Sequence, residues 1–158
     1  MTDLLSATGD SRTFKEMINR LNEIGGEPRC TALIMNLYIE DLMDAMLVKK
    51  MKKSEEFFKR MSFSDKLSLI ESLNFLPSSL INDLKIINQI HNQFAYEIDI
   101  ESQEFENKFR QYLEKLQYYH QDQSKFAKIS SSSSSNTYPV VVMMMLYYNL
   151  KAEFDKLG

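Results

Sequence analysis

Apolar residues recur every three or four positions over most of the chain, and this spacing predicts amphipathic α-helices. The pattern is clearest over residues 79–98, where one helical face carries a continuous stripe. That stripe consists of Leu80, Leu84, Ile87, His91, Phe94 and Ile98. A second face runs over residues 30–48 through Ala32, Met35, Ile39, Leu42 and Met46. Both segments are predicted to be helices that bury these faces in a common core.

Start and stop signals bound the other predicted helices. A glycine pair at 25–26 ends a first helix that begins at Ser11, and Pro28 lies in the first turn of the next helix. Either Ser62 or Ser64 caps a later helix. The remaining predicted segments are a short helix over 54–61, a helix over 63–74, a loop over 74–79 around Pro77 and a helix over 102–120.

Six consecutive serines at 130–135 interrupt this pattern, and such a low-complexity tract is typical of a flexible loop. The segment after Pro139 is apolar around its whole circumference, so it is either fully buried or half covered by a partner. A single helix is not stable alone in water. We therefore expect one domain over 11–158, with 138–156 docked on the bundle or on a second copy. Residues 1–10 are predicted to be a flexible N-terminus.

The sequence predicts an all-α fold, a helical bundle of five to seven helices. The chain has 158 residues, enough for a single core, and its four Gly and three Pro are too few for a turn-rich β-sandwich or barrel. The antiparallel core is expected from 30–48, 63–74, 79–98 and 102–119. The expected core side chains are Phe63, Leu84, Ile87, Phe94 and Val141.

The charge balance disfavours a protein that holds nucleic acid by electrostatics alone. The chain carries 19 basic and 22 acidic residues, a net charge of −3, whereas such proteins carry a basic excess on the face that binds. The strongest basic run is Lys49, Lys50, Lys52 and Lys53. It is either a phosphate-binding patch or a solvated helix C-terminus, where cations are favoured.

The single cysteine and the length of the apolar runs indicate the compartment in which the protein is expected to reside. The one cysteine, Cys30, cannot form an internal disulfide, which fits a reducing compartment. Residues 1–10 lack the basic and apolar regions of a signal peptide. The longest apolar run, Val140–Tyr148, falls short of the roughly 20 residues that span a bilayer. We expect a soluble, cytoplasmic protein with no membrane partner.

Candidate chemistry is sparse. The two His and one Cys are not at ligand spacing, so no metal site is expected. The glycine pair at 25–26 lacks the repeat and the following Lys-Ser/Thr of a phosphate loop, and no cofactor is expected. His91 has two interpretations. It is either a histidine at the edge of the core, satisfied by a carbonyl or amide, or a general base in a cleft, since imidazole titrates near neutrality.

Residues 62–100 carry an ordered set of motifs. Phe63 and Lys66 stand at a helix start, and the next helix contains Asp83-Leu84, Ile87, Ile90 and then His91-Asn92-Gln93-Phe94-Ala95-Tyr96. Upstream lie Arg29-Cys30-Thr31-Ala32-Leu33 and Tyr38-Ile39-Glu40-Asp41-Leu42. This order resembles the mannitol operon repressor-like proteins, a family within the HEPN class of helical domains. The resemblance extends over about residues 14–155 and implies an all-α bundle of that class.

The resemblance also implies a loss of chemistry. Ribonucleases of the HEPN class resemble one another in an Arg followed four to six positions later by a His, which together handle the RNA phosphate and the proton transfers. Here His91 stands at the Arg position and Tyr96 at the His position. Imidazole lacks the permanent charge and the bidentate fork of Arg, and Tyr, with a pKa of about 10, is a poor base at neutral pH. A retained scaffold without catalysis is therefore expected, and we do not expect an enzyme.

The spacing of the two motif positions bears on assembly. Positions five apart on a helix differ by about 140° in direction, so His91 and Tyr96 cannot converge from one straight helix. In the class, the motif helices of two protomers meet, so the resemblance implies a homodimer whose cleft is lined or filled by His91, Asn92 and Tyr96. The candidate binding or interface residues are Lys66, Asn88, His91, Asn92, Tyr96 and Glu97.

Three functional hypotheses follow. The first is a non-catalytic regulatory or interaction protein that presents helical surfaces, as a dimer, to a protein partner. The family name implies transcriptional repression, but no helix-turn-helix with a basic recognition helix is visible, so direct DNA or RNA binding is unsupported. The second is a weak or altered metal-independent ribonuclease with His91 as base and Lys66 or Arg29 on the phosphate. The third is an antitoxin-like partner of an active relative.

Overall fold

The computed structural model describes residues 16, 19, 23, 28–96, 102–116 and 138–158. This part contains six helices and no strand, in agreement with the predicted all-α class. The helices are α3 (Pro28–Met51), α4 (Glu55–Lys59), α5 (Phe63–Leu73), α6 (Ser78–Tyr96), α7 (Ser102–Leu113) and α10 (Tyr138–Lys156). Of the predicted first helix, Glu16, Asn19 and Glu23 are described, and all three are helical. The predicted N-terminal tail, Glu97 and the serine tract lie outside the described residues.

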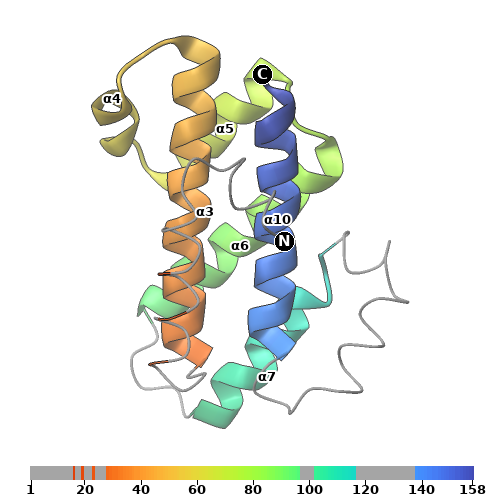
Figure 1. Ribbon diagram of the computed structural model, residues 1–158. Helices are drawn as coiled ribbons and strands as arrows, with labels where there is room; N and C mark the ends of the chain where they lie inside the picture. Colours follow the sequence, from red (N-terminus) through yellow and green to blue (C-terminus); the bar gives the residue numbers. More distant parts are fainter. Residues whose placement is uncertain (1–15, 17–18, 20–22, 24–27, 97–101, 117–137) are drawn as a thin grey trace.

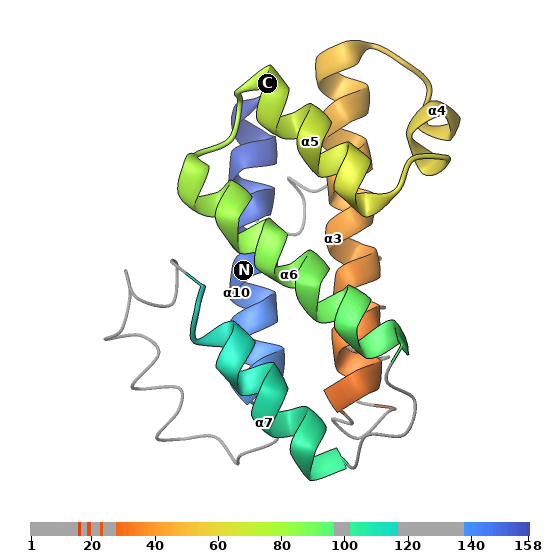
Figure 2. The ribbon, with the colours of Figure 1, turned by 180° about the vertical axis from the view of Figure 1, so that it is seen from behind.

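The helices form two layers. The long helices α3 and α10 lie side by side and run in the same direction (Figure 1). Helices α5 and α6 cross them on one side, and α7 lies next to α6 in the same layer, toward the lower end of the molecule, where it also contacts α3 and α10 (Figure 2). The short α4 joins α3 to α5 and packs on α3. The C-terminal ends of α3, α5 and α10 gather at one end of the molecule, which is the upper end in both views.

The core forms where the predicted apolar faces meet. From α3 it receives Ala32, Met35, Ile39, Leu42, Met43, Met46 and Leu47, and from α6 it receives Leu80, Ile81, Leu84, Ile87 and Ile90. Helices α7 and α10 add Phe105, Phe109, Leu146 and Leu150. The predicted core residues Phe63, Leu84 and Ile87 are buried, whereas the side chains of Phe94 and Val141 lie outside the described part. Burial of these faces is the main source of stability, because apolar surface leaves water.

Local capping decides where α5 begins and ends. Ser62, and not Ser64, is its N-cap, and the Ser62 hydroxyl accepts a hydrogen bond from the Asp65 backbone N–H at 3.2 Å. Asn74 ends the helix in the left-handed conformation, φ 52°, which Asn tolerates better than most residues. This start places Phe63 and Lys66, three residues apart, on the buried side of the helix.

The prediction for α7 was too long. The sequence indicated a helix over 102–120, but α7 ends at Leu113, and the Lys115 N–H closes a tighter turn on the Tyr112 carbonyl at 3.1 Å. Leu116 is buried immediately after this turn. Packing of that side chain overrides the helix propensity of the segment, which contains no glycine or proline stop.

In the described part of the chain, every helix is too short or too polar to span a membrane.

Candidate functional site

A buried ammonium group joins α5 to α3. The Nζ atom of Lys66 lies 2.7 Å from Oε1 of Glu40 and 2.8 Å and 3.0 Å from Oδ1 and Oδ2 of Asp44. The Lys66 side chain is only 2% exposed, and that of Asp44 is 5% exposed. Glu40 and Asp44 are four residues apart and therefore lie on one side of α3, where both reach the same cation. We call these three residues the α3–α5 charge cluster.

The charge cluster holds two carboxylates against one ammonium. Burial by itself would lower the pKa of Lys66, but hydrogen bonds and charge from Asp44 and Glu40 outweigh burial and raise it. Lys66 therefore stays charged at neutral pH. Burial raises the pKa of Asp44, with a further increase from Glu40, against the opposing effect of Lys66. The ammonium is thus neutralised within the protein and presents no free charge to a ligand.

Asp41 lies beside this cluster on the outer side of α3. Its pKa is raised, first by partial burial and then by the charge of Asp44, while Lys59 of α4 lowers it. Lys59 itself pairs with Glu55 at 2.7 Å on the surface of α4. Asp41 is exposed, and no described cation lies within ion-pair distance of it. The middle of α3 therefore carries an excess of negative charge.

The α6 candidates lie next to α5. The side-chain amide of Asn88 donates a hydrogen bond from Nδ2 to the Ser64 hydroxyl at 2.8 Å and so ties α6 to the start of α5. His91 lies one turn further along α6 and is half buried. Its Nδ1 atom is buried and has no hydrogen-bond partner among the described residues. Asn92 is exposed, the side chain of Tyr96 lies outside the described part, and Glu97 is not described.

A second buried polar atom lies on α3. Asn36 is 2% exposed, and its Oδ1 atom accepts no hydrogen bond from the residues that the structure describes. Such unpaired atoms are rare in folded proteins, because a buried polar group that has lost its water costs free energy. Asn36 precedes Glu40 by four residues and therefore lies on the same row of α3 as the carboxylates of the charge cluster.

The sequence pattern indicated Lys66 as a candidate residue but did not indicate its partners. Glu40 belongs to the segment that resembles the family's opening helix, and Asp44 had no assigned role. A signal was present in principle. Lys66 falls on the apolar side of its helix, and a lysine there needs a buried partner. The carboxylate pair at i and i+4 on α3 supplies that partner.

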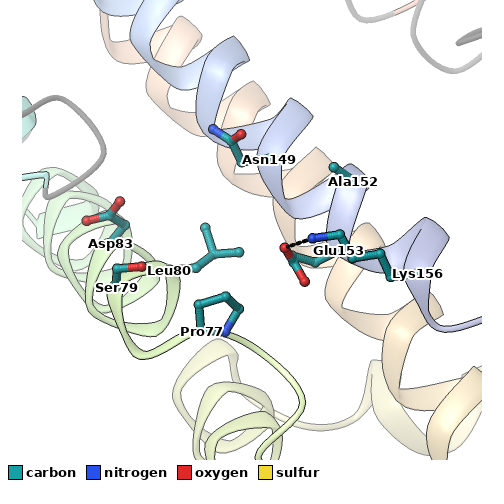
Figure 3. Close-up of a pocket in the computed structure, with 8 residues that line it drawn as sticks. All are labelled: Pro77, Ser79, Leu80, Asp83, Asn149, Ala152, Glu153 and Lys156. Carbon is teal, nitrogen blue, oxygen red and sulfur yellow. Dashed lines mark hydrogen bonds and ion pairs between the residues drawn. The ribbon is translucent and has the colours of Figure 1, made fainter. Parts of the chain in front are cut away.

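A polar hollow of about 250 Å³ lies elsewhere, between the start of α6 and the end of α10 (Figure 3). It is lined by Pro77, Ser79, Leu80, Asp83, Asn149, Ala152, Glu153 and Lys156. Glu153 and Lys156 pair across one helical turn at 2.7 Å. The lining includes Asp83 of the Asp83-Leu84 motif but none of the candidate binding or interface residues, so the hollow is separate from the positions of His91 and Lys66.

In the described ranges, no group of three or more His, Cys, Asp or Glu side chains is placed to hold a metal ion.

Comparison of the chain with protein-family models, with curated proteins and with solved structures finds no match. What this chain does therefore has to be inferred from the chemistry of its own side chains.

Proposed function

We propose that this chain is a non-catalytic regulatory or interaction protein, similar to the mannitol operon repressor-like group, which acts as a homodimer and presents helical surfaces to a protein partner. Transcriptional regulation is the process that the resemblance implies. In this proposal the chain contacts other proteins rather than DNA or RNA.

The environment of Lys66 carries the proposal. A lysine that binds phosphate has to present its ammonium to the ligand, whereas this ammonium is buried and already held by Glu40 and Asp44. A phosphate brought to this position would also meet two carboxylates of like charge. We therefore infer a structural role for Lys66, which joins α5 to α3.

The residue types at the two motif positions point the same way. His91 cannot provide the lasting positive charge of an Arg, and Tyr96 is a poor proton acceptor at neutral pH. One observation favours the ribonuclease alternative, since no described residue forms a hydrogen bond with Nδ1 of His91 and this atom is not committed to another group. Of the two cations considered for the phosphate, Lys66 is already held by carboxylates and the side chain of Arg29 lies outside the described part, so among the described side chains that atom alone makes a weak site.

The test is RNA cleavage by the purified protein over roughly pH 6–8, where imidazole titrates. We expect no cleavage of several RNAs by the natural protein or by His91→Ala. The double variant His91→Arg with Tyr96→His is expected to gain cleavage, because it restores the missing pair on the scaffold. Cleavage by the natural protein that disappears in His91→Ala would establish the ribonuclease instead. The mass of the protein in solution, from light scattering, tests the dimer separately.

A further inference from the structure

Charge is separated along α3. The acidic segment lies in the middle of the helix and consists of Glu40, Asp41 and Asp44. The lysine end follows it and consists of Lys49 and Lys50 in the last turn with Lys52 and Lys53 immediately after the helix. These two stretches give one helix a negative middle and a positive end.

Among the residues that the structure describes, no ion pair neutralises the lysine end. In the described part, no carboxylate lies within ion-pair distance of its four ammonium groups. The other described helices differ, because their surface lysines pair with carboxylates, as in Lys59–Glu55, Lys85–Glu71, Lys108–Glu104 and Lys156–Glu153. Two of the four lie over aromatic rings, Lys49 4.6 Å from the Phe154 centroid and Lys50 5.6 Å from that of Phe75.

The helix dipoles neutralise only part of the positive charge of the lysine end. A helix C-terminus carries about half a negative elementary charge, and three such termini gather at this end of the molecule (Figures 1 and 2). Together they offset less than half of the charge on four ammonium groups. In the part of the chain that the structure describes, a positive surplus therefore remains.

The acidic segment has the opposite surplus. Lys66 neutralises part of it, but Asp41 is exposed and has no described cation within ion-pair distance. Partial burial and the neighbouring carboxylates disfavour its charged form. A cation supplied from outside would relieve that cost.

A single ridge of α3 connects the two regions. Leu33, Leu37, Asp41, Ala45 and Lys49 follow one another at intervals of four residues and therefore form one row along the helix surface. Leu33 is 43% exposed and Leu37 is 58% exposed, although both are large apolar side chains. Asp41 and Lys49 are also exposed, while the small Ala45 between them is half buried.

We propose that this ridge is the contact surface between two copies of the chain, with their α3 helices crossing in opposite directions at Ala45. A two-fold axis through position 45 brings Asp41 of each copy opposite Lys49 of the other, because both lie four residues from the axis. The remaining lysines face the acidic segment and Leu37 of the second copy. The chain thus carries both halves of a complementary surface, which is the arrangement that specifies a partner.

This inference rests on the dimer of the proposed function and specifies which helix forms it. The family resemblance implied contact through α6 at His91, Asn92 and Tyr96. The separated charges along α3 favour this helix instead.

Sedimentation of the full chain over a range of concentrations tests the proposal. We expect a dimer that weakens between about 0.1 M and about 1 M salt, as the Debye length falls from about 10 Å to about 3 Å. Asp41→Lys and Lys49→Glu each place like charges opposite one another, so each is expected to weaken association roughly tenfold or more. Mixing the two variants restores dimers, because each chain retains the partner that the other needs.

The double variant Asp41→Lys with Lys49→Glu provides a check within one chain. It is expected to dimerise with itself and not with the natural protein, and it decides the question if a single variant does not fold. Glu71→Lys and Lys85→Glu make the same charge changes at the exposed pair on α5 and α6, and we expect them to leave the dimer unchanged.

Three results would overturn the proposal. A dimer that survives both single variants places the interface elsewhere, and loss of that dimer in His91→Glu would locate it on α6 while the proposed dimeric function stands. Equal loss in the control variants shows a general effect of charge. A natural protein that remains monomeric removes the dimer itself, whereas the RNA cleavage test still decides between a binding protein and an enzyme.

Discussion

Lys66 and Asp44 form an almost fully buried ion pair between α5 and α3, with Nζ 2.8 Å from Oδ1 and 3.0 Å from Oδ2. Such a pair adds little to stability compared with well-packed apolar side chains, because both charges lose their water. Removal of one partner is costly, since the other charge is left buried and unpaired. The pair therefore specifies how α5 sits on α3 more than it strengthens the fold.

Loss of the ammonium should be strongly destabilising. We expect Lys66→Met to lower the free energy of unfolding by roughly 3–5 kcal/mol, because Glu40 and Asp44 then face each other without a cation. Urea denaturation measures the change. The triple variant with Glu40→Gln and Asp44→Asn is expected to recover most of the loss, because the stranded charges are gone.

The matched control for this change is Lys85→Met. Lys85 pairs with Glu71 at 2.9 Å, but both side chains are about half exposed, so the expected loss is about 1 kcal/mol or less. Equal losses in Lys66→Met and Lys85→Met would contradict a special role for the buried cluster.

Asp41 should respond to pH in a defined direction. Partial burial and the neighbouring carboxylates raise the pKa of Asp41 in the folded state. The contribution of this group to stability is therefore fully present below the ordinary pKa of an aspartate, 3.8, and is lost as the pH rises through the raised pKa. Asp41→Asn should therefore increase stability at neutral pH, by a few tenths of a kcal/mol for this exposed group. The gain should vanish at acid pH. Denaturation of dilute, monomeric protein at both pH values measures it, and a loss of stability at neutral pH would refute this account.

The hydrogen bond between Ser64 and Asn88 can be measured with a double-mutant cycle. Ser64→Ala and Asn88→Ala are each expected to cost about 0.5–1.5 kcal/mol, since they remove a 2.8 Å bond between α5 and α6. The double variant should cost less than the sum, which gives the coupling between the two side chains. Strict additivity would mean that the bond does not hold the helices together in solution.

Asn36 offers a substitution that should stabilise the protein. Its buried Oδ1 atom has no partner in the described part of the chain, so Asn36→Leu, which keeps a similar size, is expected to raise the free energy of unfolding by about 1–3 kcal/mol. Asn92→Leu on the exposed side of α6 controls for helix propensity and should change stability by about 0.5 kcal/mol or less. A destabilised Asn36→Leu would indicate that the amide has a partner in solution, such as a bound water.

The local sequence was sufficient to predict the helical class and the buried faces. Phe63, Leu84 and Ile87 are buried as expected, because an apolar stripe with helical spacing has only one way to leave water. The start of α3 at Pro28 was also predicted, since proline suits a first turn. The choice between Ser62 and Ser64 was not, because either hydroxyl can cap and only the packing of Phe63 and Lys66 separates them.

Only the tertiary structure decided which side chains meet. Lys66 is 26 residues from Glu40 and 22 from Asp44, and Asn88 is 24 from Ser64. Helical spacing tells which side of its own helix a residue occupies, but it contains no information about the helix that packs opposite. That choice depends on how all the apolar faces share one core. The sequence by itself therefore determined the helices and their buried sides, while the packing of α3 against α5 and α6 turned a candidate phosphate ligand into an internal ion pair.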